Sequence, residues 1–387
     1  MPRPWNCPAA WRFLIAGLAV FGSLRAAPSA GYSIPVVDLS GQTGRQVVVD
    51  RRPGQYLGHP TTVLLEDGHT ILCVYPMGHG RGAIQLKRSR DGGRTWSDPL
   101  PVPDNWSTSR ETPTIHRVVD ATGHRRLIVW SGLWPARLSV SDDDGGHWTP
   151  LKAVGDWGGI VVMSSVEAVR GKPGHYRAWF HDDGRYLHAD AVPVKPPVFR
   201  LYQVESVDGG LNWGAPRELF ASADVNLCEP GAIRSPDGKT LALLLRENRR
   251  VRNSHLMVSR DEGETWSAPV ELPGALTGDR HVGRYAPDGR LLISFRDTTR
   301  ESATHGDWVA WVGRFEDLLQ GREGQYRVQL MKNTRDADCA YPGVECLPDG
   351  TFVTTTYGHW TRGESPWIVS LRFRLDELDA LRNTRSP

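Results

Sequence analysis

A phrase of eight residues recurs four times in this chain and limits the folds that the chain can adopt. Its pattern is Ser-x-Asp-x-Gly-x-x-Trp, and the copies read SRDGGRTW (89–96), SDDDGGHW (141–148), SVDGGLNW (206–213) and SRDEGETW (259–266). The shared aspartates stand 52, 65 and 53 residues apart. Self-similarity at such a period is typical of solenoids, propellers and arrays.

The residues of this phrase, which we call the Asp box, predict a tight turn rather than a catalytic site. Asp-Gly and Gly-Gly supply the positive φ angles that a tight turn needs. An aspartate side chain can accept hydrogen bonds from backbone N–H groups of its own turn. The segments that precede the copies are strand-like and read AIQLKRS, ARLSVS, FRLYQVES and HLMVS. We therefore interpret each Asp box as a structural connection between two strands.

A second repeated pattern divides the chain into six units. Each unit has a strand, a turn near Asp-Gly and an apolar strand, and the units begin near His59, Thr112, Gly158, Glu229, Arg280 and Tyr341. A further strand follows in each unit. Short strands at even spacing, four to a unit, predict an all-β fold, a six-bladed β-propeller with Asp-box turns. The regular repeats count against the alternative, a β-sandwich with insertions.

The N-terminal residues differ from the rest of the chain. Basic residues precede the apolar run FLIAGLAVFG (13–22), and small residues follow it. This pattern predicts a signal peptide over residues 1–30, cut between Ala26 and Ala30, and hence a secreted or periplasmic protein. An uncleaved anchor is the alternative, but the run is short for a bilayer, so we expect no stable membrane insertion after cleavage. Residues 31–387 would then form a single propeller domain.

Charge and cysteine content exclude some classes of partner and cofactor. The formal net charge of +2 argues against nucleic acid as a partner. Cys73, Cys228, Cys339 and Cys346 show no Cys-x-x-Cys spacing, and with no other metal or cofactor motif the sequence predicts neither. Export would permit a disulfide between Cys339 and Cys346, but we favour buried free thiols.

In a propeller, the starts of the inner strands and the ends of the next strands meet around the axis on one face, where a site is expected. The residues that this rule brings together include His59, Arg110, Glu111, Asp182, Glu229, Arg246, Arg280, Arg296 and Tyr341. Arginines bind a carboxylate through paired N–H donors, and a carboxylate beside a tyrosine can take its proton. Arginines together with a tyrosine–carboxylate pair predict a site for an acidic sugar such as sialic acid. Sialic acid has a carboxylate on its anomeric carbon, which would repel a carboxylate nucleophile but not a neutral tyrosine.

These features resemble the sialidase (neuraminidase) superfamily, through the Asp boxes and the six units over about residues 45–375. In that family a glutamate opens a late inner strand and an arginine ends the next strand. Glu229 and Arg246, 17 residues apart, stand in matching places. Another carboxylate-binding arginine opens the following blade, and the nucleophilic tyrosine opens the last, in the places of Arg280 and Tyr341. The resemblance implies a retaining exo-α-sialidase, with Glu229 polarising the nucleophile Tyr341.

The chain departs from the family's pattern at the first blade. Sialidases open that blade with an arginine, where this chain has LGHP and therefore Gly58 or His59. Arg81 or Arg110 could reach the same place. We therefore expect the substrate to be bound by Arg246, Arg280, Arg81, Arg110, His59 and Arg296.

A second departure concerns the acid/base residue. The family's aspartate belongs between residues 75 and 88, which contain neither aspartate nor glutamate. His79 is the titratable side chain of suitable range in this segment, so we predict that it protonates the leaving oxygen. Glu111 and Asp182, on neighbouring blades, are reserve candidates.

Three functions remain open at this stage. The first is a secreted exo-α-sialidase that releases a terminal sialic (nonulosonic) acid, with sialylated or other acidic glycans as its partners. The second is a lyase or hydrolase acting on a uronate-containing polysaccharide, in which a tyrosine–histidine pair abstracts a proton beside a carboxylate. The third is a glycan-binding propeller without turnover, because one fold hosts several functions.

Overall fold

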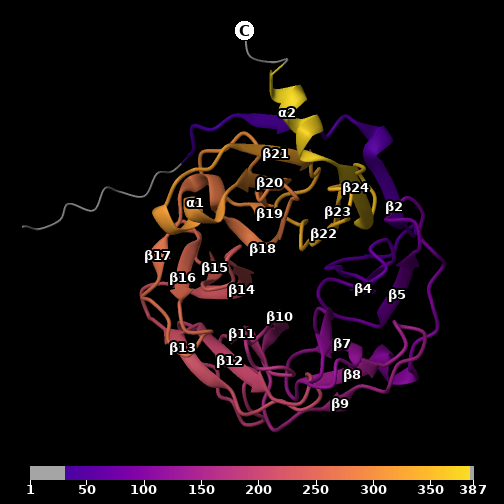
Figure 1. Cartoon of the computed structure of the whole chain (residues 1–387), viewed down its shortest axis with the longest axis vertical. Coiled ribbons are helices and arrows are strands. Elements are labelled where there is room, and N and C mark those ends of the chain that lie inside the picture. Colours follow the sequence, from indigo (N-terminus) through magenta and orange to yellow (C-terminus); the bar gives the residue numbers. More distant parts are fainter. Residues whose placement is uncertain (1–30, 384–387) are drawn as a thin grey trace, which may run out of the picture.

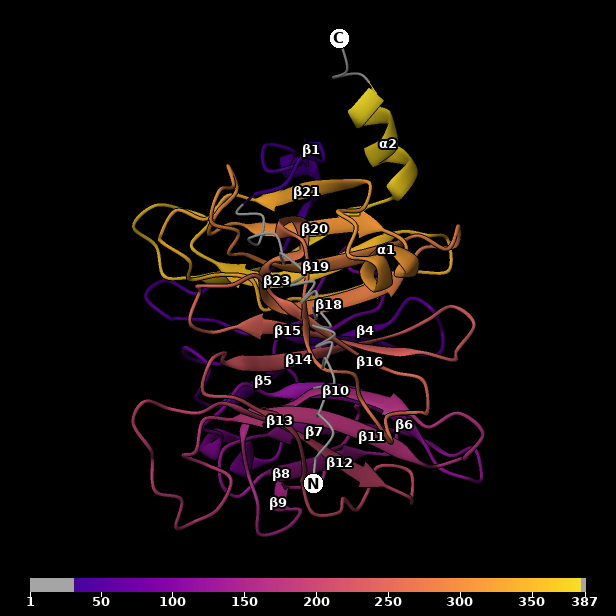
Figure 2. The same cartoon turned by 90° about the vertical axis from the view of Figure 1, so that its left-hand side faces the viewer.

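The structure is a computed structural model that describes residues 31–383, and these form six β-sheets arranged in a ring around a central axis (Figure 1). The sheets follow one another in chain order, which confirms the all-β, six-bladed propeller. We number the blades I to VI by their inner strands. The predicted signal peptide over residues 1–30 lies outside the described residues. In the view at a right angle, α2 (Leu375–Asn383) stands out from the edge of the ring, close to β1 (Val36–Asp38) (Figure 2).

The first three blades come from the N-terminal half of the ring. Blade I has β3 (Thr61–Leu64), β4 (Ile71–Pro76) and β5 (Ile84–Ser89). Blade II has β6 (Thr114–Val119), β7 (Arg125–Ser131), β8 (Arg137–Ser141) and β9 (Lys152–Ala153). Blade III has β10 (Ile160–Ala168), β11 (Tyr176–Asp182), β12 (Arg200–Ser206) and β13 (Arg217–Ala221).

The other three blades complete the ring. Blade IV has β14 (Leu227–Arg234), β15 (Leu241–Glu247), β16 (His255–Ser259) and β17 (Val270–Glu271). Blade V has β18 (Gly278–Tyr285), β19 (Leu291–Asp297), β20 (Trp308–Gly313), β21 (Tyr326–Met331) and β1. Blade VI has β22 (Gly343–Cys346), β23 (Phe352–Gly358), β24 (Trp367–Phe373) and β2 (Gln46–Asp50). Short helices connect some strands: α1 (Phe315–Gln320), η1 (Thr43–Arg45), η2 (Asp104–Thr108) and η3 (Gly274–Leu276).

The ring closes by pairing the two ends of the described chain. β2, from the N-terminal side, is the outer strand of blade VI and runs antiparallel to β24, with Val48 opposite Val369. β1 adds to the outer edge of blade V by pairing in parallel with β21. Because one blade cannot bury its own faces, this closure joins all the blades into one cooperative structure.

Blade I has three strands, where the sequence predicts four to a unit. The segment after its Asp box reads SDPLPVPDNW (97–106) and carries proline at every second position from 99 to 103. Proline cannot donate to a strand ladder, so this segment makes isolated backbone bonds to β5, such as Leu100 N–H to Leu86 O at 2.8 Å, and then enters η2.

All four Asp boxes are turns with shared hydrogen bonds, as predicted. In each box the aspartate Oδ1 accepts the backbone N–H four residues later, at 2.8–3.0 Å. The serine Oγ accepts the N–H of the shared glycine at 2.7–3.0 Å. The turns lie away from the ends of the second strands, since Ser89 at the end of β5 pairs with Ile71 at the start of β4.

Apolar side chains fill the space between each pair of neighbouring blades. The second strand of a blade has both faces against neighbours, so β4, β11, β19 and β23 are buried along their whole length. A strand buried on both faces reads as a continuous apolar run, which explains segments such as LALLL (241–245). The polar groups at the strand ends are therefore held on a rigid scaffold.

The four cysteines in residues 31–383 are free thiols, as favoured from the sequence, and the Cys339–Cys346 disulfide is wrong. The two residues lie at opposite ends of β23, because Cys339 bridges to Gly358 and Cys346 pairs with Phe352. The length of a strand separates the sulfur atoms.

No helix in the described part of the chain is long and apolar enough to cross a membrane.

Candidate active site

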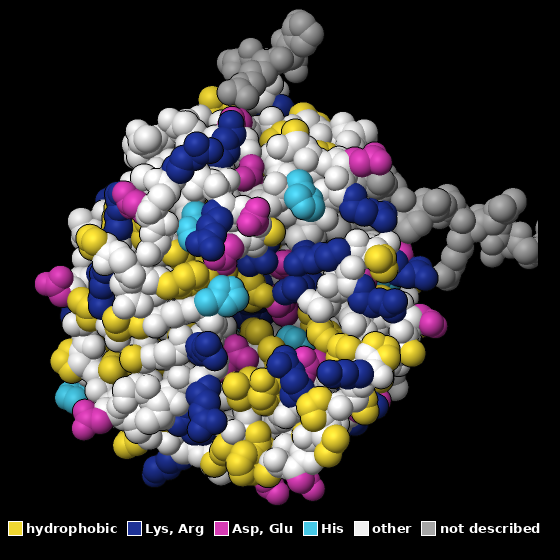
Figure 3. All heavy atoms as spheres, turned by 180° about the vertical axis from the view of Figure 1, so that it is seen from behind, with side chains coloured by type: hydrophobic (Ala, Val, Ile, Leu, Met, Phe, Trp, Pro, Cys, Tyr) yellow, Lys and Arg dark blue, Asp and Glu magenta, His cyan; other side chains and the backbone are white. Residues whose placement is uncertain are grey.

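A cavity of ≈ 510 Å³ lies where the inner strands begin. Its lining brings together six of the residues predicted from the sequence, namely His59, His79, Arg81, Arg110, Glu229 and Tyr341. Glu111, a reserve acid/base candidate, also lines it. On the face drawn in Figure 3, basic, acidic and histidine side chains gather around the hollow at the centre of the ring.

Local backbone irregularities aim the first residues of the inner strands at the axis. His59, Glu229 and Arg280 have φ angles of 52°, 52° and 57°. Around Glu229 the pairing of β14 with β15 shifts register between Cys228 and Gly231. A bulge of this kind re-aims a side chain, and a positive φ at a residue other than glycine costs about 1–3 kcal/mol. The surrounding sheet holds these side chains in place against that cost.

Tyr341, Glu229 and Arg246 form a compact hydrogen-bonded group at the cavity. The hydroxyl of Tyr341 donates to Glu229 Oε1 at 2.5 Å. Arg246 Nη1 donates to the same oxygen at 2.7 Å and to the Tyr341 hydroxyl at 3.0 Å. The group joins blades IV and VI, and 112 residues separate its tyrosine from its glutamate.

The protonation states of this group follow from burial and from the neighbouring charges. Burial acts to raise the pKa of Glu229, but the positive charge of Arg246 and the bond from Tyr341 outweigh it and leave that pKa below its ordinary value. Burial, and then the negative charge of Glu229, raise the pKa of Tyr341 well above its ordinary value. Glu229 is therefore a carboxylate that accepts a hydrogen bond from a neutral tyrosine.

Asp279 forms an ion pair with the arginine of this group, and the sequence did not predict its role. Its carboxylate pairs with Arg246 at 3.2 Å, Arg250 at 2.7 Å and Arg296 at 3.0 Å. The only signal in the sequence is its place directly before Arg280 in GDRH. The carboxylate fixes the guanidinium that contacts the tyrosine.

The structure places Arg296 beside Tyr341 but not in the lining of the cavity. Its guanidinium lies 5.3 Å from the centre of the Tyr341 ring and donates to the backbone oxygen of Cys339 at 2.5 Å. A cation over an aromatic ring is attracted to it electrostatically. Arg246 likewise contacts the tyrosine without lining the cavity, and Arg280 lines a different cavity.

The two histidines that line the cavity, His59 and His79, differ in their surroundings. His79 is 65% exposed, and its Nε2 lies 3.5 Å from Asp338 Oδ1. His59 is buried, and burial lowers its pKa well below the ordinary value, so its ring is neutral. The Nδ1 of His59 accepts the N–H of Gly80 at 3.1 Å, and its Nε2 lies 3.2 Å from the hydroxyl of Tyr357.

In residues 31–383, no group of three His, Cys, Asp or Glu side chains could hold a metal ion.

Glu111 has the unusual electrostatics expected of a proton donor. The side chain is buried at the start of blade II, and its Oε1 accepts the N–H of Thr112 at 2.7 Å. Burial above all, together with the nearby charge of Glu229, raises the pKa of Glu111 to about 7. Asp182, the other reserve, does not line the cavity and instead accepts backbone N–H groups of Gly184 and Tyr186.

The loop between β11 and β12 supplies a wall that sequence reasoning missed. Arg185 and Tyr186 from this loop line the cavity, and the Arg185 guanidinium lies 4.8 Å from the centre of the Tyr186 ring. The backbone oxygen of Leu187 accepts the N–H of Gly158, which attaches the loop to the start of blade III. The length of the loop, between a strand ending HDD and a strand beginning FRLY, is the signal that the sequence offers.

The fold and the polar cavity define a sialidase-like Asp-box propeller, and the comparisons with known proteins agree with this class. Residues 40–353 match the model of a family described as the BNR repeat-like domain, so the chain belongs to that family. No curated protein sequence matches the chain.

Solved structures that resemble the chain include a protein of unknown function, a sialidase and a trans-sialidase. A protein of unknown function from Dyadobacter fermentans aligns with a TM-score of 0.66 and 15% identity, over 85% of this chain and 97% of the other. The NanB sialidase of Streptococcus pneumoniae aligns with a TM-score of 0.59 and 13% identity, over 86% of this chain and 71% of the other. The intramolecular trans-sialidase of Ruminococcus gnavus gives a TM-score of 0.55 and 15% identity, over 84% and 95%. At such identities the likeness concerns the fold.

Proposed function

We propose that the protein is a glycoside hydrolase of exo-α-sialidase type, which releases a terminal sialic (nonulosonic) acid with retention of configuration. One observation carries the proposal: the hydrogen-bonded group of Tyr341, Glu229 and Arg246 lies at a cavity lined by further arginines. A tyrosine nucleophile suits a sugar that carries a carboxylate on its anomeric carbon, because an anionic nucleophile would be repelled there.

In this mechanism Tyr341 attacks while it loses its proton. Its oxygen forms a bond to the anomeric carbon, the bond from that carbon to the leaving oxygen breaks, and the proton of Tyr341 passes along the 2.5 Å hydrogen bond to Glu229. The N–H group of Arg246, 3.0 Å from the tyrosine oxygen, stabilises the negative charge that develops there. The transfer has to accompany the attack, because burial and Glu229 disfavour a free phenolate.

Arg81 and Arg110 are the side chains that we assign to the sugar carboxylate. Both line the cavity with exposed side chains, and neither forms an ion pair with a carboxylate of residues 31–383. A guanidinium with free N–H donors can bind a carboxylate through two parallel bonds. Arg185 is a third guanidinium in the lining, already paired with Asp183 at 2.7 Å.

Two residues can supply the proton for the leaving oxygen. Glu111 is the stronger candidate, because a pKa of about 7 keeps much of it protonated at neutral pH and the residue lines the cavity. His79, predicted from the sequence, is the alternative and is more exposed. After the leaving group departs, the deprotonated acid takes a proton from water as the water oxygen attacks the anomeric carbon. The bond from that carbon to Tyr341 breaks, and the tyrosine oxygen takes back its proton from Glu229.

Incubation with a fluorinated sialic-acid donor that traps the glycosyl-enzyme tests the proposal directly. Peptide mass mapping should place the adduct on Tyr341. Tyr341→Phe should retain the fold and the binding of sialic acid while turnover falls at least about a thousandfold. An adduct on another residue, or turnover near wild type in this variant, would refute the assignment.

A second candidate function, lyase action on a uronate-containing polysaccharide, is favoured by the position of His59. Its ring is neutral and lies 4.5 Å from the ring of Tyr341, centre to centre, so a histidine–tyrosine pair stands at the cavity. Such a pair can remove a proton beside a carboxylate. Assay of uronate glycans for the absorbance of an unsaturated product separates this function from hydrolysis, and glycan binding without any product would support a binding protein.

A further inference from the structure

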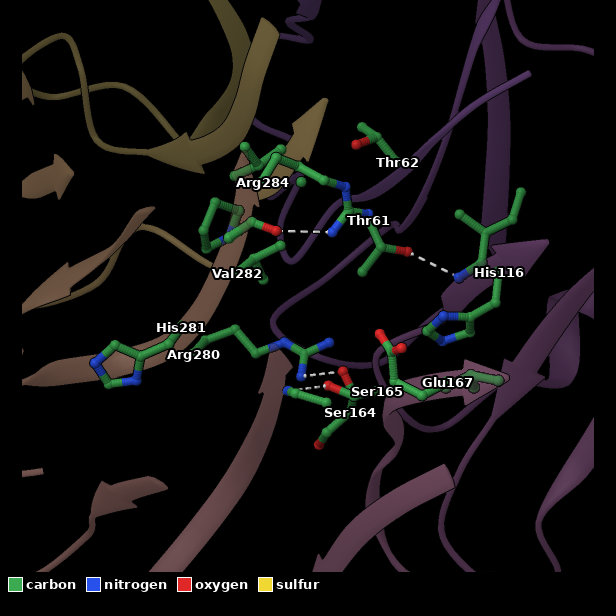
Figure 4. Close-up of a pocket in the computed structure, with 17 residues that line it drawn as sticks. Thr61, Thr62, His116, Ser164, Ser165, Glu167, Arg280, His281, Val282 and Arg284 are labelled. Carbon is green, nitrogen blue, oxygen red and sulfur yellow. Dashed lines mark hydrogen bonds between the residues drawn. The ribbon is translucent and has the colours of Figure 1, made fainter. Parts of the chain in front are cut away.

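A second cavity, of ≈ 200 Å³, is lined by residues that include Ser164, Glu167 and Arg280 (Figure 4). The inner strands of all six blades line it, so it sits at their centre. Its lining residues follow those of the first cavity along the same strands: Ser164 follows Val161, and Ala232 follows Glu229. The two cavities are therefore successive levels of one axis.

Arg280 places an unpaired positive charge in this axial cavity. The residue is 3% exposed, and its side chain runs from β18 across to β10, where Nη1 donates to the backbone oxygen of Ser164 at 2.9 Å (Figure 4). Its Nε has no hydrogen-bond partner. No carboxylate of residues 31–383 forms an ion pair with it, whereas Arg246 and Arg296 share Asp279.

The other charged groups that line the axial cavity have counter-charges of their own. Glu167 lies 3.5 Å from the guanidinium of Arg234, and Arg284 lies 3.9 Å from the carboxylate of Glu345. These pairs leave Arg280 as the one lysine, arginine, aspartate or glutamate without an ion pair among the described residues that line the cavity.

Two acidic groups toward the active site, Glu229 and Glu111, attract the charge of Arg280, but neither forms an ion pair with it. Glu229 is engaged by Arg246 and Tyr341. Glu111 holds its proton up to about pH 7, because burial raises its pKa. Burial lowers the pKa of Arg280 and outweighs the opposing attraction of Glu229 and Glu111, so the charge is costly at this place. An isolated buried charge destabilises a protein unless an opposite charge accompanies it.

We infer that the axial cavity binds a small monovalent inorganic anion, such as chloride, on the guanidinium of Arg280. An anion there would accept charge-assisted hydrogen bonds from the guanidinium of Arg280, which lines the cavity. A volume of ≈ 200 Å³ holds such an ion with a few waters, each of which occupies about 30 Å³ in the liquid. Because the guanidinium of Arg280 carries one positive charge, it favours an anion with one negative charge. This site differs from the predicted role of Arg280 in substrate binding and does not depend on glycan cleavage.

The position of the anion can be observed directly in the whole protein. Crystals soaked in sodium bromide should give an anomalous scattering peak at hydrogen-bond distance from the Arg280 guanidinium. Absence of that peak would overturn the inference. A sialic-acid soak in which the sugar carboxylate contacts Arg280 would also overturn it and would return this arginine to the substrate site.

Thermal melting gives an independent measurement in solution. Exchange of gluconate for chloride or bromide at constant ionic strength should raise the melting temperature of the wild type by about 2 °C when the halide is at about ten times its Kd. Arg280→Met should lose this dependence. Arg284→Met is the matched control, because Arg284 lines the same cavity but has a counter-charge, and it should respond like the wild type. Equal halide effects in Arg280→Met and the wild type would contradict the assignment.

Discussion

Replacing Glu111 by glutamine should change how the stability of the protein depends on pH. Glu111 is 8% exposed, and burial together with Glu229 raises its pKa from 4.5 to about 7. Because the pKa is higher in the folded state, the folded protein binds this proton more tightly than the unfolded chain. The associated stability is fully present below pH 4.5 and is lost as the pH rises through 7.

The size of the effect follows from the two pKa values. As the pH rises from below 4.5 to well above 7, the contribution of Glu111 to the free energy of unfolding should fall by about 3 kcal/mol. About 2.5 kcal/mol of this loss occurs between pH 5 and pH 8. Glutamine keeps the oxygen that accepts the N–H of Thr112 but cannot ionise. Glu111→Gln should therefore gain about 2.5 kcal/mol relative to the wild type when the pH is raised from 5 to 8.

Urea unfolding of both proteins at the two pH values measures this difference. Other titrating groups are common to the two proteins and cancel in the comparison. Glu218→Gln, at an exposed carboxylate on the outer strand of blade III, is the control and should follow the wild type. Parallel stability profiles for Glu111→Gln and the wild type would show that the buried carboxyl does not hold its proton as the structure implies.

Three other substitutions test separate parts of the structure. Asp208→Ala removes two backbone hydrogen bonds of the third Asp box, so the free energy of unfolding should fall by about 1–3 kcal/mol while turnover per folded molecule stays unchanged. A variant that melts normally but has lost turnover would contradict this structural role. Asp279→Asn leaves its three arginines without their shared charge and should cost about 3–5 kcal/mol in urea unfolding, whereas wild-type stability would argue against the network. Turnover should fall by about 10²–10⁴-fold in Glu111→Gln and by less than about tenfold in His79→Gln, and the reverse order would assign the proton donor to His79.

The sequence by itself determined the repeated parts of the fold. An Asp box is closed by hydrogen bonds within eight residues, from Ser89 to Trp96 for example, so its pattern predicts its structure. The count of six blades follows from the second repeated pattern, the strand–turn–strand unit. The sequence also brought Glu229, Arg246 and Tyr341 to one place, because propeller geometry fixes where strand ends meet. The repeat pattern did not predict that blade I has only three strands. Prolines in the segment that would form its outer strand prevent regular pairing.

Only the tertiary structure decided which charges are paired and which are buried. Asp279 and Arg280 are adjacent in the sequence, yet the first pairs with three arginines and the second has no ion pair among the described residues. Neighbouring side chains of a strand point to opposite faces, but which face meets three arginines and which meets the axial cavity depends on the blades on either side. The pKa of Glu111 likewise depends on burial and on a charge from blade IV. Hydrogen bonding within a turn is local, whereas desolvation and ion pairing depend on residues that only the closed ring brings together.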